Sequence, residues 1–424
     1  MNKKKIIIIP LVILLIFLIL WESTRNSLVE YALPLVSETS NSEELTERLT
    51  KDEAREDLRA LWGSLEEYHV MFAKGNKNIW HAKHIYNRVK TSIKDDISVL
   101  ELWRSMAQIV SALHDPHTEV SYISEENREL QIQNFEMEDT INGIPINDLY
   151  KHFLQLYSYD QINTAKYKFE SELRNEKTLN LLGINTSHDI IYEKKGTGEI
   201  QKLYFKPINI NMDDNNCQYQ IYKEQDLAVF SLKSCILNMD YMNSLQNFFG
   251  EIQNSNINRI ILDLRDNIGG DSSVISEFIK YLDVQEYYVS GKVIEKGNNT
   301  LDFTDKYLLK NEKVDNPFDG EVYILTSTKT FSSATLFAMV IQDNKIGKVI
   351  GATPGNMPEG YGDIKKIQFD NSKLVMTVST KYFYRIDESK SEQPIVPDYK
   401  LTNREVNNID FTSKDFLSIL NSPK

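Results

Sequence analysis

Two short apolar runs, each ending in a turn of small residues, are the feature that most constrains how this chain folds. Ile260–Leu264 leads into a turn that contains Gly269–Gly270, and Val322–Leu325 leads into a turn that contains Ser332–Ser333. An apolar helical pattern follows the second turn. Because the carboxyl ends of buried strands are where an open α/β sheet gathers its reactive groups, we expect both turns to lie at one edge of the sheet.

The residue types in these turns suit acyl transfer. A serine at a strand-to-helix turn has an exposed hydroxyl beside the positive end of a helix, and a glycine pair offers N–H groups that approach an oxyanion closely. Either turn alone could simply connect a strand to a helix. Together with a histidine in the earlier segment VSALHDPHTEV, they favour a catalytic site.

Three blocks, in this order, resemble the C-terminal-processing (tail-specific) serine peptidase family, including its tricorn-like branch. They read VSALHDPHTEV, IILDLRDNIGGD and TFSSATLFAMVIQDNKIGKVIGATPG, and the resemblance extends from about Glu44 to Leu401. The family's register makes Ser332, rather than Ser333, the nucleophile. We place the oxyanion hole at the backbone N–H groups of Gly269 or Gly270 and of Ser333.

The general base is expected to be a histidine. The tail-specific branch uses a Ser–Lys dyad, but the position of its lysine falls at Met357 here. The tricorn-like branch uses the histidine of the first block, which is His117, and a neutral imidazole is a suitable base near pH 7. His114 is a competitor that matches no family position.

The residue that orients the base follows less directly. The tricorn-like branch places a serine just before the histidine, where this chain has Pro116, and a glutamate late in the chain. Glu392, in SEQPIVPDY, is the candidate for that late carboxylate. Glu388 and Asp115 are alternatives.

The sequence predicts an α/β fold. It divides the chain into five segments. They are a transmembrane or signal-anchor segment (1–22), a tether (23–42), a helical cap domain (43–118), a mixed insert (119–215) and an α/β peptidase core (216–424). The resemblance implies a crotonase/Clp-protease-like core of ββα units, and INGIPINDLYKHF resembles the end of a degenerate PDZ-like insert. The expected strands are Leu227–Leu232, Ile260–Leu264, Val322–Leu325, Lys348–Ile350 and Lys373–Tyr384.

The amino terminus predicts a membrane anchor. The apolar run Ile6–Leu20, closed by Trp21, spans roughly 24 Å as a helix, somewhat less than the hydrocarbon core. The lysines Lys3–Lys5 should stay in the cytoplasm and leave the remainder outside the cell membrane as a single-pass protein. No small-x-small cleavage site follows the run, so an anchor is favoured over a cleaved signal peptide, which would give a secreted enzyme.

Composition and charge limit the partners and cofactors that this protein is expected to bind. The formal net charge of −13 argues against a nucleic-acid-binding face. No metal or cofactor is expected, since His81 and His84 on one helical face lack a third ligand. Cys217 and Cys235 flank a predicted hairpin, and a disulfide between them is left open.

Three function classes result. The first is a membrane-anchored extracytoplasmic serine peptidase that acts on a polypeptide substrate. A catalytically inactive binding protein on the same fold is the alternative, because Pro116 and Met357 depart from the family pattern. An acyl-CoA-type enzyme is the third, and an extracytoplasmic location argues against it.

Overall fold

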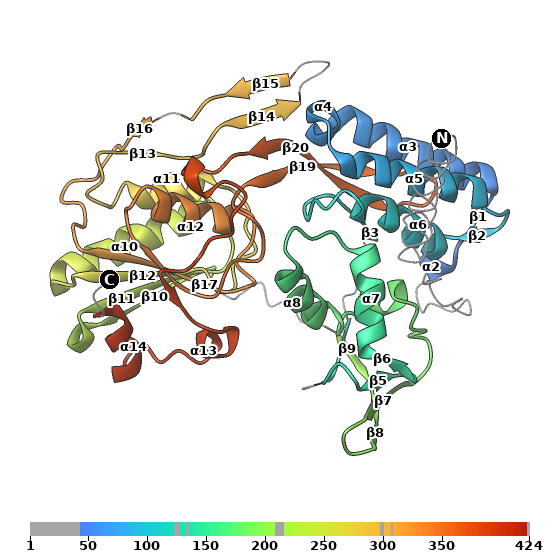
Figure 1. The fold of residues 1–424 in the computed structure, drawn as a ribbon. Coiled ribbons are helices and arrows are strands. Elements are labelled where there is room, and N and C mark those ends of the chain that lie inside the picture. The colour runs from blue at the N-terminus through green and yellow to red at the C-terminus, as the bar shows by residue number, and fades with distance from the viewer. Residues whose placement is uncertain are drawn as a thin grey trace, which may run out of the picture.

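The computed structural model describes residues 43–122, 128–132, 135–207, 216–296, 301–306 and 308–421. The predicted anchor and tether, residues 1–42, lie outside these ranges. Within them, no helix is both long enough and apolar enough to cross a membrane. Helices and sheets alternate through the described chain, which confirms the α/β fold class (Figure 1).

The helices have the following bounds: α2 Glu43–Thr46, α3 Lys51–Tyr68, α4 Val70–Lys74, α5 Lys77–Ser92, α6 Val99–Ser111, α7 Ile146–Leu156, α8 Ile162–Glu172, α9 Glu176–Leu181, α10 Met239–Ser255, α11 Ser273–Ile279, α12 Ser333–Asp343, α13 Asn403–Asn407, α14 Lys414–Leu420, and the 3₁₀ turns η1 Lys223–Gln225 and η2 Glu388–Lys390.

The strands have the following bounds: β1 Arg48–Leu49, β2 Ile97–Ser98, β3 Glu119–Ser121, β4 Arg128–Leu130, β5 Thr140–Ile141, β6 Ile144–Pro145, β7 Ile190–Lys194, β8 Glu199–Leu203, β9 Phe205–Pro207, β10 Cys217–Tyr222, β11 Leu227–Leu232, β12 Arg259–Asp263, β13 Glu286–Tyr288, β14 Val293–Lys296, β15 Leu301–Thr304, β16 Leu308–Lys310, β17 Glu321–Thr326, β18 Lys348–Gly351, β19 Gly360–Gln368, β20 Val375–Phe383 and β21 Tyr399–Lys400.

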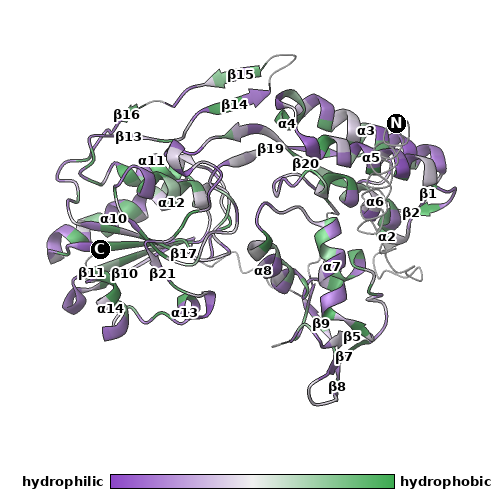
Figure 2. Cartoon of the chain, in the orientation of Figure 1, coloured by the Kyte–Doolittle hydropathy of each residue, from purple (hydrophilic) through white to green (hydrophobic). Residues whose placement is uncertain are grey.

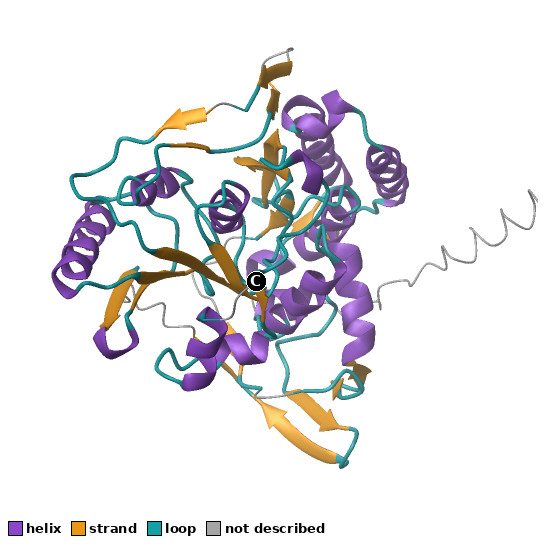
Figure 3. Cartoon of the chain, turned by 60° about the vertical axis from the view of Figure 1, so that its left-hand side comes forward, coloured by secondary structure: helices purple, strands orange, loops and turns teal. Residues whose placement is uncertain are grey.

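A six-stranded sheet forms the core of the carboxyl-terminal part, in the order β10-β11-β12-β17-β18-β21. The first pair is antiparallel and the remaining pairs are parallel. Side chains of α10, α11 and α12 pack on one face and those of α13 and α14 on the other. Figure 3 shows helices on both sides of this sheet. A strand covered on both faces is apolar where it is buried, as Leu227–Phe230 of β11 and Ile260–Leu262 of β12 are (Figure 2).

All five predicted apolar runs form strands, so this part of the sequence interpretation is confirmed. The predicted hairpin also forms, as the antiparallel pair β10–β11. Its register pairs Cys217 with Leu232, so Cys235 lies beyond the hairpin. The backbone of Cys235 instead forms an isolated parallel β-bridge with Gly270 of the next loop. Both thiols are free, and the disulfide left open above is not formed.

The amino-terminal helices pack into a second core. Capping boxes at Thr50 and Ser98 begin α3 and α6, and the apolar faces of α3, α5 and α6 are buried together. The segment INGIPINDLYKHF forms β5, β6 and the first turns of α7, and β5 pairs with β7 in a small four-stranded sheet.

The long β19–β20 hairpin joins these two parts (Figure 1). It begins just after the loop that follows β18. At its turn, Asn371 and Ser372 donate hydrogen bonds to the buried carboxylate of Asp57 in α3. Strand β20 also pairs with β3, and it thereby fixes the loop that contains His117 relative to the six-stranded sheet.

Candidate active site

Ser332 lies where β17 ends and α12 begins. Its φ is +54° and its ψ is −123°, a strained conformation for a residue with a side chain. Its N–H donates to Asn356 Oδ1 at 2.8 Å, and Thr335 Oγ1 donates to the same oxygen at 2.7 Å. The Ser332 hydroxyl does not cap the helix and lines a cavity. A sharp strand-to-helix turn of this kind exposes a serine as a nucleophile.

The glycine loop after β12 lies against this serine. Gly269 has a φ of +99°, and a Cβ at this position would approach the Ser332 Cβ to 2.7 Å. Gly270 has a φ of +136°, and its Cβ would lie 2.3 Å from the Cys235 carbonyl oxygen. Gly269 is therefore required for the backbone to pass this close to Ser332, and Gly270 for its close approach to Cys235.

Two N–H groups remain available beside Ser332. The Gly269 N–H donates to Asn267 Oδ1 at 2.8 Å. No acceptor within the described ranges takes the N–H of Gly270 or of Ser333. The Ser333 hydroxyl donates to the Gly270 carbonyl at 2.6 Å and holds the two segments together. Of the two predicted glycine donors, Gly270 is thus the one that is free.

His117 reaches the same cavity from the loop between α6 and β3. Its ring packs on Phe331, the residue before Ser332, with ring centroids 4.9 Å apart. Thr377 of β20 donates its hydroxyl to the His117 carbonyl at 2.8 Å. His117 Nδ1 lies 3.7 Å from Asp115 Oδ1, so Nε2 is the ring nitrogen left for Ser332.

Asp115 is the carboxylate that faces this imidazole. It is fully buried and accepts hydrogen bonds from Thr118 Oγ1 at 2.6 Å and from the His117 N–H at 3.0 Å. His69 Nε2 lies 3.2 Å from its other side. Burial raises the pKa of Asp115, but the contacts with His117 and His69 outweigh it and hold the pKa well below its usual range.

The structure does not bring Glu392 to the base. Glu392 is exposed, and its N–H donates to Glu359 Oε2 at 3.3 Å. No hydrogen bond or ion pair in the described part of the chain joins its carboxylate to His117. Glu388 is also exposed and pairs with Lys306 at 3.1 Å. Asp115, two residues before the base, is the alternative that the fold places against it.

Three residues at the site were not predicted from the sequence, because no motif marks them. They are His69, Asp160 and Asn356, which positions the Ser332 N–H. Asp160 Oδ2 accepts the Met357 N–H at 2.8 Å, while its buried Oδ1 has no hydrogen-bond partner among the residues that the structure describes. Burial raises the pKa of Asp160 to about 6. Met357 itself lines the cavity.

His114, the competing histidine, packs against Tyr159 with ring centroids 5.5 Å apart and does not line the cavity. Its φ is +55°, and burial lowers its pKa. Its place next to the site is therefore structural.

The cavity that contains Ser332 has a volume of about 1030 Å³. We call it the catalytic cavity, and its walls come from both parts of the molecule. They include His117, Tyr159, Tyr167, Ile268, Gly270, Ser332, Ser333, Leu336, Met357, Tyr361, Ile364, Thr377 and Phe383. An open cavity with apolar walls and a few polar groups suits an extended polypeptide.

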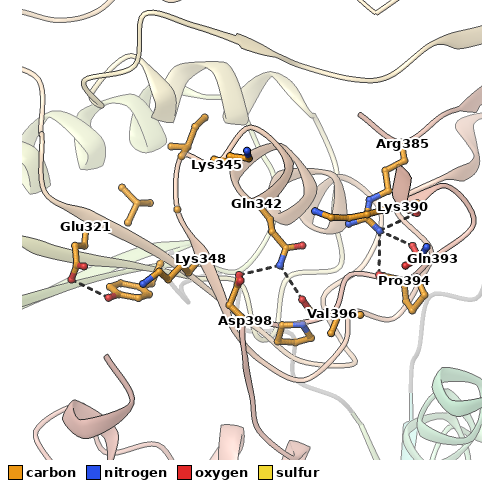
Figure 4. Close-up of a pocket in the computed structure, with 15 residues that line it drawn as sticks. Glu321, Gln342, Lys345, Lys348, Arg385, Lys390, Gln393, Pro394, Val396 and Asp398 are labelled. Carbon is orange, nitrogen blue, oxygen red and sulfur yellow. Dashed lines mark hydrogen bonds between the residues drawn. The ribbon is translucent and has the colours of Figure 1, made fainter. Parts of the chain in front are cut away.

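A second cavity, of about 690 Å³, lies at the amino ends of β17 and β18, away from Ser332 (Figure 4). Gln342 donates there to the Asp398 carboxylate at 3.0 Å. The buried guanidinium of Arg385 pairs with Asp343 at 2.9 Å and donates to the Gln393 carbonyl at 2.8 Å. The N–H groups of Arg385 thus bind the loop that precedes β21 and hold it in place.

A serine at a strained strand-to-helix turn, free N–H groups beside it and an imidazole–carboxylate pair across the cavity define the class of serine hydrolases. Residues 226–401, which include the glycine loop and Ser332, match the model of Peptidase family S41.

Two solved structures of mature CPAF have the same fold. The complex with lactacystin has a TM-score of 0.64 at 12% sequence identity and covers 84% of this chain and 95% of that one. The other has a TM-score of 0.62 at 10% identity and covers 88% of this chain and 95% of that one. Among curated proteins, no sequence matches this chain significantly.

Proposed function

We propose that this protein is a membrane-anchored, extracytoplasmic serine peptidase that hydrolyses peptide bonds through Ser332 and His117. One observation carries the proposal. Ser332 and His117 come from segments more than 200 residues apart, yet they line one cavity beside the two free N–H groups of Gly270 and Ser333. A purely structural role for these residues would not require that arrangement.

In the acylation step, His117 Nε2 accepts the proton of the Ser332 hydroxyl as its oxygen attacks the scissile carbonyl carbon. The carbonyl oxygen becomes an oxyanion, which the N–H groups of Gly270 and Ser333 stabilise. The C–N bond then breaks, and His117 returns the proton to the leaving amine. The product is an acyl-enzyme on Ser332 and a free amino terminus.

Deacylation repeats these steps with water. His117 removes a proton from the water as its oxygen attacks the acyl carbon. The bond between the acyl carbon and Ser332 Oγ then breaks, His117 returns the proton to Ser332 Oγ, and the peptide leaves with a new carboxyl terminus. Asp115 orients the imidazole and compensates its positive charge in both steps. We assign this role to Asp115 rather than Glu392 because Asp115 is buried against the ring.

An inactive binding protein is the second candidate, and a specific distance favours it. The separation of 3.7 Å between His117 Nδ1 and Asp115 Oδ1 is longer than a hydrogen bond. Such bonds are often long in enzymes without substrate and shorten when substrate binds. In the binding protein they would stay long.

Labelling with a fluorophosphonate probe separates the two candidates. The wild-type protein should be labelled on Ser332 and should cleave an unfolded polypeptide, whereas Ser332→Ala should lose both. Ser333→Ala is the matched control and should keep the label. A wild-type protein that binds peptide but takes no label is the inactive binder.

The cellular location rests on residues 1–22. The lysines before the apolar run favour a cytoplasmic amino terminus, with a crotonase/Clp-protease-like core, a helical cap and a PDZ-like insert outside. Protease added to intact cells should then remove residues 43–424 and leave an anchored stump. A soluble chain that begins shortly after Trp21 would instead show a cleaved signal and a secreted enzyme.

A further inference from the structure

We infer that His69 is a positioning residue for the base, acting through Asp115 as a permanently neutral hydrogen-bond donor. This inference rests on the proposed peptidase function. The resulting order of groups is His117, Asp115, His69, with the second imidazole supplied by the amino-terminal helices. It adds a residue, 46 positions before Asp115 in the sequence, to the machinery of the site.

His69 connects α3 to α4 and is fully buried. Its Nδ1 accepts the backbone N–H of Met71 at 3.1 Å, which caps the start of α4. Its Nε2 lies 3.2 Å from Asp115 Oδ2, but the two atoms are not aligned as a hydrogen bond, and Nε2 has no other acceptor among the described residues. The two ring nitrogens therefore have different partners, one a donor and one an acceptor.

These partners fix the tautomer of His69. A nitrogen that accepts an N–H must present its lone pair, so Nδ1 carries no proton and the proton lies on Nε2. A second proton on Nδ1 would point at the Met71 N–H and break the cap. In our proposal this Nε2 proton is directed at Asp115 without adding a charge, and the contact tightens into a hydrogen bond when substrate binds, as misaligned catalytic hydrogen bonds commonly do.

A neutral donor is what the base requires. Thr118 Oγ1 and His69 Nε2 both act on Asp115 Oδ2, and they hold the carboxylate so that Oδ1 faces His117. Because His69 stays neutral, the charge of Asp115 remains available to the imidazolium that forms on His117. A charged neighbour would cancel it.

Tyr361 and Asp160 are further titratable groups beside this pair. Tyr361 packs its ring edge against His69 with centroids 5.1 Å apart, and burial raises the pKa of its hydroxyl to about 12. Asp160 acts electrostatically on both Asp115 and His117. Neither Tyr361 nor Asp160 carries a positive charge. Neither therefore competes with His69 for the Asp115 carboxylate as a cation.

Two substitutions separate positioning from simple support of the fold. The side-chain oxygen of asparagine lies where Nδ1 of histidine lies, so His69→Asn keeps the cap on Met71 and loses the donor to Asp115. The amide nitrogen of glutamine lies where Nε2 lies, so His69→Gln keeps the donor and loses the cap. Both variants lose the ring, so their packing costs are comparable.

His69→Asn should lower kcat about 10- to 100-fold with KM unchanged, as expected for loss of a hydrogen bond to a charged group. The acid limb of its kcat/KM profile should move to higher pH, because a carboxylate with one donor fewer holds the proton of the His117–Asp115 pair more tightly. His69→Gln should stay within about threefold of wild type. Equal losses in both variants, or unshifted pH profiles, would overturn the inference.

A spectroscopic measurement tests the tautomer without relying on activity. In Ser332→Ala, the ¹⁵N shifts of His69 should show one proton, on Nε2, from about pH 5 to pH 8. An Nδ1–H tautomer or an imidazolium in that range would overturn the inference. If the wild-type protein is inactive while these shifts hold, the proposed function fails and the geometry of His69 stands.

Discussion

The six-stranded sheet and the amino-terminal helices supply the two sides of the catalytic cavity in different ways. On the sheet side, backbone conformation makes the site: Ser332 has a φ of +54°, and Gly269 lets the backbone of the glycine loop approach it. On the helical side, side-chain contacts make it, through Asp115 and the buried His69. The sheet side of the site can be predicted from local sequence patterns. The helical side depends on residues that are distant in the sequence and that only the fold brings together.

The helical side should be the more sensitive to a single change of charge. Asp115→Asn leaves the shape of the side chain but removes the charge that faces His117, and the new amide favours the wrong tautomer of the ring. In a serine peptidase of another fold this change costs about 10⁴ in kcat. We expect a loss of about that size, measured as kcat on a peptide substrate, with labelling of Ser332 slowed in parallel. A loss below about tenfold would mean that another group orients the base.

The sheet side should respond to loss of one backbone donor. Ser333 is the first residue of α12, a position that tolerates proline, so Ser333→Pro removes its N–H. Loss of one oxyanion donor should lower kcat about 10²- to 10³-fold. Ser333→Ala keeps the N–H and loses only the hydroxyl contact with Gly270, so it is the matched control. If both variants lose the same activity at equal thermal stability, the Ser333 N–H is not a donor to the oxyanion.

The same contrast explains what could be predicted from the sequence. The strands of the sheet, the turns that end them and the position of Ser332 follow from local patterns of apolar and small residues. The partner of His117 does not. The family pattern points to Glu392, yet the Glu392 N–H donates to Glu359 and its side chain is exposed. His69 lies in a short turn between two helices, and only its packing against Asp115 gives it a role.

Asp160 lies between the two sides and should show a smaller, pH-dependent effect. Its folded pKa of about 6 lies above its ordinary value, so the folded protein keeps a proton that the unfolded chain releases. Stability therefore falls as the pH rises from about 4 to about 6 and stays lower above that. In Asp160→Asn the side chain still accepts the Met357 N–H but cannot ionise. Its stability should therefore not show this fall between about pH 4 and pH 6.

Urea unfolding at a series of pH values measures the difference. The stability of Asp160→Asn relative to wild type should rise by about 3 kcal/mol at most across that window and then stay constant. Its kcat/KM should change less than about fivefold, because Asp160 acts on His117 only through its charge. A relative stability that does not vary with pH would show that Asp160 is ionised throughout.

The smallest effect is expected at Glu392, and it decides between the family pattern and the observed geometry. Glu392→Gln should change kcat less than about twofold, since the substitution keeps the backbone N–H that binds Glu359. The matched variant Glu359→Gln alters a buried carboxylate that also accepts from Tyr382 and Ser391, and it should cost about 1–3 kcal/mol of stability. If Glu392→Gln instead lowers kcat as far as Asp115→Asn does, with unchanged stability, then the loop of residues 391–398 must move toward His117 when substrate binds. The helical side would then share its role with the sheet side.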